Sequence, residues 1–234
     1  MWDSRLAETV PQVRDRIGRA LERAGRSGDR VDIIAVTKGH PVEAVRAALA
    51  AGLTVLGENR VGELEAKVGA IGRDAAEWHL IGHLQRNKAR TAVGLFDRIH
   101  SLDSLRLART LSKEARRSDR VVHGLMQVNA SGEASKGGFA AEEAVDALGE
   151  AAALEGVVVH GLMTMAPLTD REAVLRRTFG CARTLLEECR RQLPDALRGY
   201  ELSMGMSNDF EIAIEEGATH VRLGTVLFGE RNYP

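Results

Sequence analysis

The feature that most constrains the fold is an alternation of short apolar segments with helical segments, repeated eight times along the chain. Each apolar segment is rich in β-branched residues, which is typical of a buried strand, and each is followed by apolar residues at helical spacing. The expected strands cover 33–38, 54–59, 78–82, 98–101, 121–128, 157–163, 200–203 and 220–223. The expected helices cover 3–24, 41–51, 61–71, 84–95, 105–117, 142–154, 171–193 and 208–216.

Strands separated by helices pair in parallel through right-handed crossovers. Eight units are the number that closes a (β/α)8 barrel, so the sequence predicts an α/β protein with a single barrel of this kind. The helix over 3–24 is an extra element before the first strand. An open, doubly wound sheet is the alternative. Because no change in composition marks a second domain, we expect residues 1–234 to form one domain.

Composition excludes several classes of function. The net charge is −1 with both signs interspersed, so we expect no nucleic-acid partner. No apolar run approaches the ~20 residues of a membrane span, and the N-terminus has no apolar signal core. Cys181 and Cys189 lie two helical turns apart, too far for a disulfide, which favours a reducing cytoplasm. No Cys, His and carboxylate cluster has metal-ligand spacing.

Lys38 ends the first expected strand and shares a strand face with Ile34 and Val36. In a barrel, the carboxyl ends of the strands and the loops after them carry the active site. The lysine is therefore a candidate for chemistry, although an exposed lysine just past a strand is the ordinary alternative.

The other strand ends supply a polar set that should converge on the same rim. Its members are Asn59, residues 83–85, the loop with Ser135 and Lys136, Met163, residues 203–207, and Arg222, Gly224 and Thr225. Ser207 directly precedes an expected helix, and Gly224 lets a ligand approach the backbone closely. Because barrel phosphate sites often use the loops after strands seven and eight, these residues favour phosphate binding over a plain helix cap and turn.

Arg222 shares a strand face with His220 and Gly224, so it can donate to an acceptor atom on a bound ring, or else form a salt bridge at the rim. His79, His83 and His100 show no triad spacing to a serine, so a hydrolase is set aside. A lysine facing a phosphate site across a barrel mouth points instead to pyridoxal 5′-phosphate, whose aldehyde bonds to a lysine amine.

Six motifs, which together span nearly the whole chain in order, resemble the pyridoxal phosphate homeostasis proteins (the YggS/PROSC family). They are IAVTK (34–38), GENR (57–60), WHLIGHLQRNK (78–88), HGLMTM (160–165), SMGMS (203–207) and VRLGT (221–225). The resemblance implies a barrel like the N-terminal domain of alanine racemase, with the cofactor carried on Lys38 as an internal aldimine.

The resemblance also implies roles for the other site residues. Arg222 would face the pyridine nitrogen, and Asn59 would line the pocket near the ring. The phosphate would lie against Ser207, Gly224 and Thr225. One departure is Gly137, where many relatives have a serine, and we draw no functional residue from that loop.

These roles favour a carrier over an enzyme. Arginine stays protonated, so an arginine at the ring nitrogen leaves that nitrogen unprotonated and the ring a weaker electron sink. Racemases of this type add a tyrosine from a C-terminal β-domain. This chain ends at Pro234, and its tyrosines are Tyr200 and Tyr233, so we expect no second base.

We therefore expect a monomeric, cytoplasmic protein that binds pyridoxal phosphate reversibly through Lys38, regulates its free concentration and hands it to apoenzymes. A small amino-acid racemase and a Schiff-base aldolase acting on a sugar phosphate are the alternatives, since both use a barrel lysine.

Overall fold

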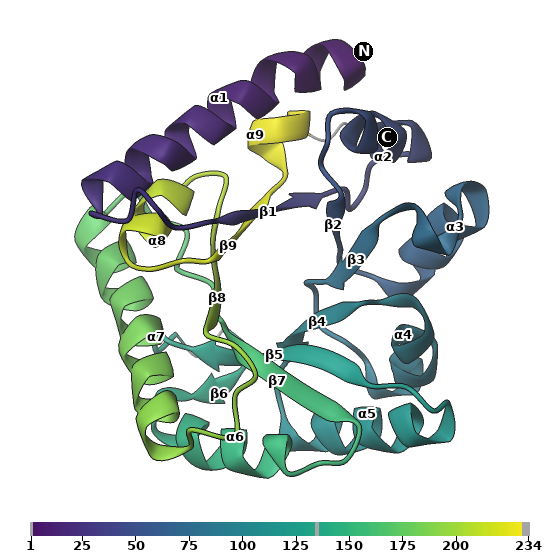
Figure 1. Ribbon diagram of the computed structural model, residues 1–234, viewed down its shortest axis with the longest axis vertical. Helices are drawn as coiled ribbons and strands as arrows, with labels where there is room; N and C mark the ends of the chain where they lie inside the picture. Colours follow the sequence, from purple (N-terminus) through teal and green to yellow (C-terminus); the bar gives the residue numbers. More distant parts are fainter. Residues whose placement is uncertain (1, 134–135, 231–234) are drawn as a thin grey trace.

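Eight parallel strands close into a barrel in the computed structural model, which describes residues 2–133 and 136–230 (Figure 1). The barrel strands are β1 (Asp32–Val36), β2 (Val55–Glu58), β3 (Glu77–Leu80), β4 (Arg98–Leu102), β5 (Val122–Asn129), β7 (Val157–Met163), β8 (Glu201–Met206) and β9 (His220–Leu223). The ring closes because β4 pairs with β5 and β9 pairs with β1. The barrel is confirmed, and the open sheet is wrong.

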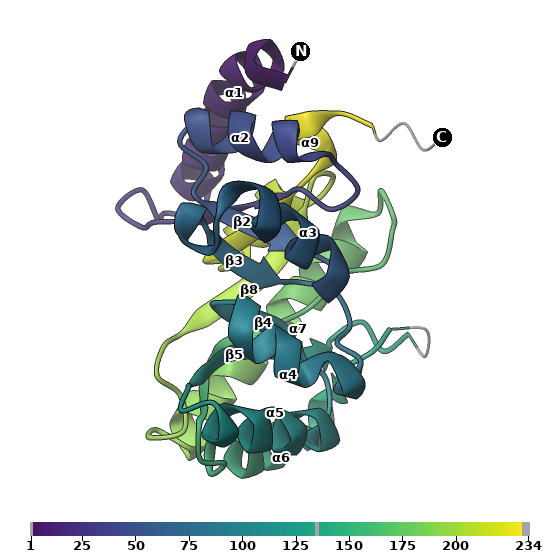
Figure 2. The same cartoon turned by 90° about the vertical axis from the view of Figure 1, so that its right-hand side faces the viewer.

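Helices surround the barrel, as Figures 1 and 2 show. They are α1 (Trp2–Arg23), α2 (Val42–Ala50), α3 (Val61–Ile71), α4 (Ala89–Leu95), α5 (Leu105–Arg117), α6 (Ala144–Ala152), α7 (Glu172–Gln192), α8 (Phe210–Glu215) and α9 (Thr225–Phe228). The extra helix α1 lies beside α2, α8 and α9, while α5 and α6 lie at the other end of the molecule in Figure 2.

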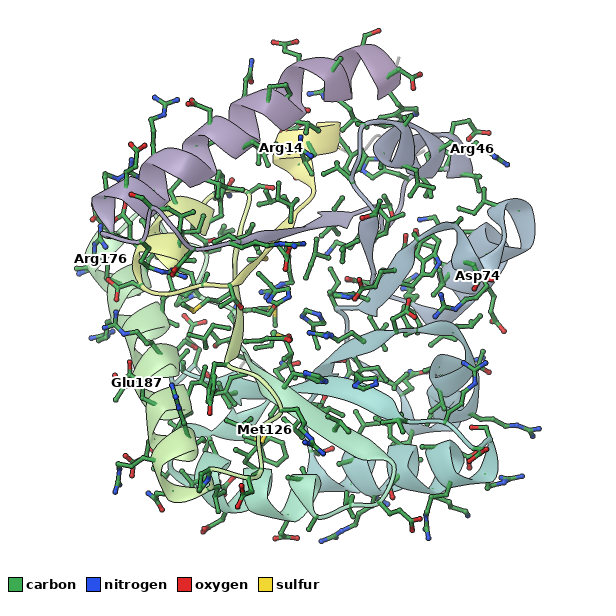
Figure 3. The ribbon with its side chains drawn as sticks, in the orientation of Figure 1. Arg14, Arg46, Asp74, Met126, Arg176 and Glu187 are labelled. Carbon is green, nitrogen blue, oxygen red and sulfur yellow. The ribbon has the colours of Figure 1, made fainter. Side chains whose placement is uncertain are left out.

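The main apolar core lies between the barrel and the ring of helices. Each long helix turns one apolar stripe inward, as Leu6, Val10 and Val13 of α1 do, and these side chains are buried. Trp78 of β3 is fully buried, and its indole N–H donates to the Arg73 carbonyl oxygen at 3.0 Å. In Figure 3 the labelled Arg176 and Glu187 extend from the outer side of α7.

The inside of the barrel is more polar than its outside. His79, His100, Ser203, His220 and Arg222 are all buried, and hydrogen bonds or ring contacts join each of them to another member of the group. Alternation along the strands explains their position, because residues i and i+2 share one face. The register pairs Ile34 of β1 with Arg222 of β9, so both lie at one level of the barrel.

Several element bounds differ from the sequence prediction. Strand β1 ends at Val36, so Lys38 lies in the turn after the strand, where Gly39 has a φ of 71°. Strand β8 continues through Met206, although residues 204–206 were expected to form a loop. The fourth predicted helix begins only at Ala89, after a 3-10 turn over Arg86–Lys88. Short elements at Phe139–Ala140 (β6) and Thr225–Phe228 (α9) were not predicted.

Residues 2–133 and 136–230 contain neither a membrane-spanning helix nor a metal-binding cluster. No helix in them has the length and apolar character needed to cross a membrane. No group of three or more His, Cys, Asp or Glu side chains in them is placed to hold a metal ion. Both cysteines are free thiols.

Candidate functional site

A cavity of about 610 Å³ opens at the carboxyl ends of the barrel strands. All six residues that the sequence singled out line this cavity, namely Lys38, Asn59, Ser207, Arg222, Gly224 and Thr225. They come from five different loops or strands, between residues 38 and 225. The prediction that these positions converge at one mouth is therefore confirmed as geometry.

Lys38 reaches the cavity from the turn that follows β1. The turn continues the sheet for one residue, because the Thr37 N–H donates to the Gly57 carbonyl oxygen at 3.1 Å. It then reverses at Gly39, whose positive φ of 71° is a conformation that side-chain-bearing residues rarely adopt. Lys38 is half-buried, and Val36, which lies two residues earlier on the same face, also lines the cavity.

Arg222 lines the cavity from β9, the strand that pairs with β1, and is 5% exposed. Its Nη1 donates to the Ser203 carbonyl oxygen at 2.8 Å and to the Ser203 hydroxyl at 2.7 Å, and its Nη2 donates to the Thr164 carbonyl oxygen at 2.9 Å. These contacts fix the plane of the guanidinium group. Burial lowers the pKa of Arg222 to about 10, and Asp209 acts weakly in the opposite direction. The side chain is still a cation at neutral pH.

A chain of hydrogen bonds runs from Arg222 through the barrel interior. The Ser203 hydroxyl lies 2.9 Å from His100 Nδ1, His100 Nε2 lies 2.9 Å from His79 Nδ1, and His79 Nε2 lies 2.9 Å from the Glu77 carboxylate. The hydrogen bond from His79 lowers the pKa of Glu77, which therefore accepts. The chain thus runs from the Arg222-bound Ser203 hydroxyl at one end to the Glu77 carboxylate at the other.

These hydrogen bonds include a contact that spacing along the sequence did not reveal. Spacing along the sequence gave no reason to place a histidine beside a serine, yet His100 and Ser203 are hydrogen-bonded across 103 positions. Ser203 is fully buried and also accepts from Arg222, so it is not exposed to the cavity as a nucleophile would be. Its role is to hold the arginine.

Ser207, Gly224 and Thr225 lie together at the start of α9. The Ser207 hydroxyl accepts from the Val226 N–H at 3.2 Å, so it braces this helix; it does not cap α8, whose first residue, Phe210, is preceded by Asp209. The plain helix cap, which was the alternative to phosphate binding at Ser207, is therefore not formed. A Cβ on Gly224 would meet Val36 only at 3.5 Å, an ordinary contact. Packing does not require a glycine there, whereas close approach of a ligand would.

Asn59 follows β2 and lies against Gly82. A Cβ at position 82 would fall 2.5 Å from the Asn59 carbonyl oxygen, so only glycine permits this approach. Gln85 and Met163, which also follow strands, are not among the cavity-lining residues, and Ser135 lies outside the described residues.

Other residues also line the cavity. His83, which belongs to the polar set named from the sequence, pairs with Asp103 at the mouth, with His83 Nδ1 2.6 Å from Asp103 Oδ2. Gln127 of β5 donates to the Gly137 carbonyl oxygen at 2.9 Å. Residues 165–169 after β7 complete the rim. The sequence analysis did not name Asp103, Gln127 or residues 165–169; Asp103 and residues 165–169 follow predicted strands, and Gln127 lies within one, so position was the available signal.

The arrangement suits a particular kind of ligand. A lysine amine lies on one part of the wall, a fixed guanidinium lies on another, and the hydroxyls of Ser207 and Thr225 lie with Gly224 on a third. Hydroxyl groups can donate to an anion, and the glycine lets it approach the backbone. A small ring that carries a carbonyl group, an acceptor atom and an anionic tail matches all three.

Comparison with known proteins agrees with this geometry. Residues 11–232 match the family model for the alanine racemase N-terminal domain. An alanine racemase from Clostridium difficile shares the fold, with a TM-score of 0.76 at 16% identity over 99% of this chain and 56% of that chain. The fold and the site thus define a barrel of the alanine racemase N-terminal type.

Closer relatives narrow the assignment. The pyridoxal phosphate homeostasis protein of Aquifex aeolicus is 42% identical over 97% of this chain and 98% of its own length. The Pseudomonas aeruginosa protein of the same name is 41% identical, over 98% and 97%. The structure of Synechococcus elongatus PipY with PLP bound has a TM-score of 0.84 at 40% identity, covering 96% of this chain and all of that one. The chain belongs to the family of pyridoxal phosphate homeostasis proteins.

Proposed function

We propose that this protein binds pyridoxal 5′-phosphate through Lys38 and regulates the supply of free cofactor. The observation that carries the proposal is the convergence of a lysine, a fixed arginine and a helix start on one cavity. Relatives at 34–42% identity bear the name of a homeostasis protein and not of an enzyme, which supports a carrier. PipY, which shares the fold, has been solved with PLP bound.

Each wall has a distinct role in this proposal. The Lys38 nitrogen and the aldehyde carbon form a C=N bond with loss of water, which is the covalent chemistry the cofactor supplies. Arg222 donates toward the ring nitrogen and, as a cation, keeps a proton off it. Ser207, Gly224 and Thr225 bind the phosphate, and Asn59 borders the ring.

The proposal also covers the oligomeric state, the contact with an apoenzyme and the cellular compartment. In this proposal the protein acts as a monomer with one domain. Leu168 lies on the rim of the cavity and is 89% exposed, so an apoenzyme that receives the cofactor would meet an apolar contact there. The free thiols of Cys181 and Cys189 fit a reducing cytoplasm.

Borohydride trapping followed by peptide mapping tests the covalent role. We expect the reduced pyridoxyl group on Lys38 in the wild type and its loss in Lys38→Ala, together with the visible absorbance of the lysine-bound cofactor. Lys136 lines the same cavity, so Lys136→Ala is the matched control and should keep the label on Lys38.

The proposed phosphate contacts are tested by titrating the protein with pyridoxal phosphate and, separately, with pyridoxal, which lacks the phosphate. We expect at least about tenfold weaker binding, in line with the loss of a charged hydrogen-bonded group. A label on another lysine, or equal affinity for both compounds, would remove the basis of the proposal.

A further inference from the structure

The turn that carries Lys38 is held from outside the barrel by three charged residues. Lys67 of α3 is 4% exposed, and its Nζ lies 2.6 Å from Glu58 Oε1, 3.0 Å from Glu63 Oε1 and 2.8 Å from the Thr37 carbonyl oxygen. An ammonium group has three donors, and all three are used. We refer to Glu58, Glu63 and Lys67 as the turn clamp.

The clamp contacts the backbone on both sides of Lys38. Before the lysine, the Thr37 carbonyl oxygen accepts from Lys67, and the Thr37 hydroxyl donates to Glu58 at 2.5 Å. After it, the Gly39 N–H donates to Glu63 Oε1 at 2.5 Å. The clamp thus fixes residues 37 and 39 and leaves the side chain between them directed to the cavity.

Burial makes this a costly arrangement to maintain. Glu58 is fully buried, and its Oε2 has no hydrogen-bond partner among the residues described. Burial raises the pKa of Glu58 to about 7, against the opposing effects of Lys67 and Thr37. A buried ion pair is a weak way to stabilise a fold compared with apolar packing. Its placement around one functional side chain therefore calls for a reason beyond stability.

We propose that the turn clamp positions Lys38 for reaction with the aldehyde. This inference rests on the proposed function and adds residues outside the cavity that govern it. Neither Glu58, Glu63 nor Lys67 lines the cavity, so none of them touches the ligand. They act through the backbone of residues 37–39, because a lysine on a disordered turn samples many orientations and attacks more slowly.

Glu63 offers the sharpest test because it is only part-buried, with 25% of its side chain exposed. In Glu63→Ala the Gly39 N–H loses its acceptor. In Glu63→Gln the side-chain oxygen can still accept, so this variant should restore the contact. Glu65 lies one position past Leu64 on the same helix, is exposed, and provides the matched control Glu65→Ala.

Two measurements are needed for these variants. The first is deuterium uptake by the cofactor-free protein in a peptide covering residues 37–40, which we expect to be at least about tenfold faster in Glu63→Ala than in Glu65→Ala. The second is the rate of covalent bond formation with pyridoxal phosphate, which we expect to fall roughly threefold to tenfold in Glu63→Ala and to recover in Glu63→Gln.

The outcomes separate this inference from the proposed function. If Glu63→Ala matches Glu65→Ala in bond formation, the clamp does not position Lys38, whatever its effect on exchange. The same holds if the uptake is unchanged. If the wild type itself forms no covalent bond, the proposed function fails, and the exchange comparison still reports whether the clamp orders the turn.

Discussion

Two neighbouring parts of the cavity wall, the turn after β1 and strand β9, each have a buried cation in or behind them, and the two cations differ in their electrostatic setting. Behind Lys38, the ammonium of Lys67 contacts the carboxylates of Glu58 and Glu63. In β9, Arg222 contacts two carbonyl oxygens and one hydroxyl, and no carboxylate in the described part of the chain lies within ion-pair distance of it.

The difference is between a cation that carboxylates contact directly and one that they do not. All three donors of Lys67 are used within the fold. Neutral acceptors fix the orientation of Arg222, and burial lowers its pKa to about 10, against a weaker opposing effect of Asp209. A buried cation with no carboxylate within ion-pair distance lowers stability, which supports the proposal that Arg222 is kept for a ligand.

The largest effect is expected from Lys67→Met. Removing one partner of a buried ion pair leaves Glu58 as an uncompensated buried acid, and such changes destabilise by about 3–5 kcal/mol. Urea unfolding of the cofactor-free protein measures this. Lys113→Met on α5 is the control, because that lysine is exposed and its loss should change stability by less than about 0.5 kcal/mol. Equal stabilities for the two variants would show that the clamp is not a structural ion pair.

Acidification should change the stability of the protein through two sets of buried groups that act in opposite directions. Burial lowers the pKa of His100, and it lowers the pKa of His160 to about 4 and that of His220 as well, so these groups stay neutral in the fold. The unfolded chain takes up their protons below about pH 6.5. The stability that comes from keeping these histidines neutral is therefore fully present above that pH and is lost as the pH falls below it. Burial raises the pKa of Glu58 to about 7, so on acidification Glu58 binds a proton in the folded protein before it does so in the unfolded chain. Its effect on stability is therefore opposite to that of a histidine.

Unfolding measured at pH 7.5 and 5.5 tests this balance. For His160, whose pKa is lowered to about 4, the loss at pH 5.5 is about 1.4 kcal/mol. His100 and His220 act in the same direction and Glu58 acts in the opposite one, so we expect stability to fall from pH 7.5 to pH 5.5. Glu58→Gln should steepen the loss, and His160→Gln should make it shallower. Stability that is constant or rises on acidification would contradict the assignment of neutral histidines to the interior.

Much of the fold could be predicted from the sequence because its signals are local. Apolar runs and helical spacing fixed the order of elements, and the helix 105–117 and the strands 157–163 and 220–223 were predicted with the observed bounds. In β8 the prediction stopped at Ser203, because Met204-Gly205-Met206 resembles a loop. The strand continues there because Gly205, at a φ of 90°, lies so close to α8 that a Cβ would fall 2.6 Å from Ala213.

The candidate site likewise has parts that could be predicted from the sequence and parts that could not. Barrel geometry places every strand end at one rim, so the positions of Lys38 and Arg222 follow from strand alternation. The clamp could not be predicted, because Lys67 looks like an ordinary helix-surface lysine; only the tertiary structure shows that it is buried against Thr37. The contact between His100 and Ser203 likewise depends on barrel closure and not on spacing.

The smallest change in stability is expected from Arg222→Met, which is the same type of substitution as Lys67→Met, made at the other buried cation. Lowering the arginine pKa from 12.5 to about 10 corresponds to about 3 kcal/mol of unfavourable burial, which the variant relieves. Against this, the Thr164 carbonyl oxygen loses its arginine donor, at about 1–3 kcal/mol, while the Ser203 carbonyl oxygen keeps the Thr164 N–H as a donor at 3.1 Å. We therefore expect the cofactor-free variant to change by less than about 1 kcal/mol, while pyridoxal phosphate binds at least about tenfold more weakly. Urea unfolding and an absorbance titration of the same preparation measure both quantities. A loss of stability as large as that of Lys67→Met would mean that Arg222 is a structural cation too, and the contrast between the two cations would not hold.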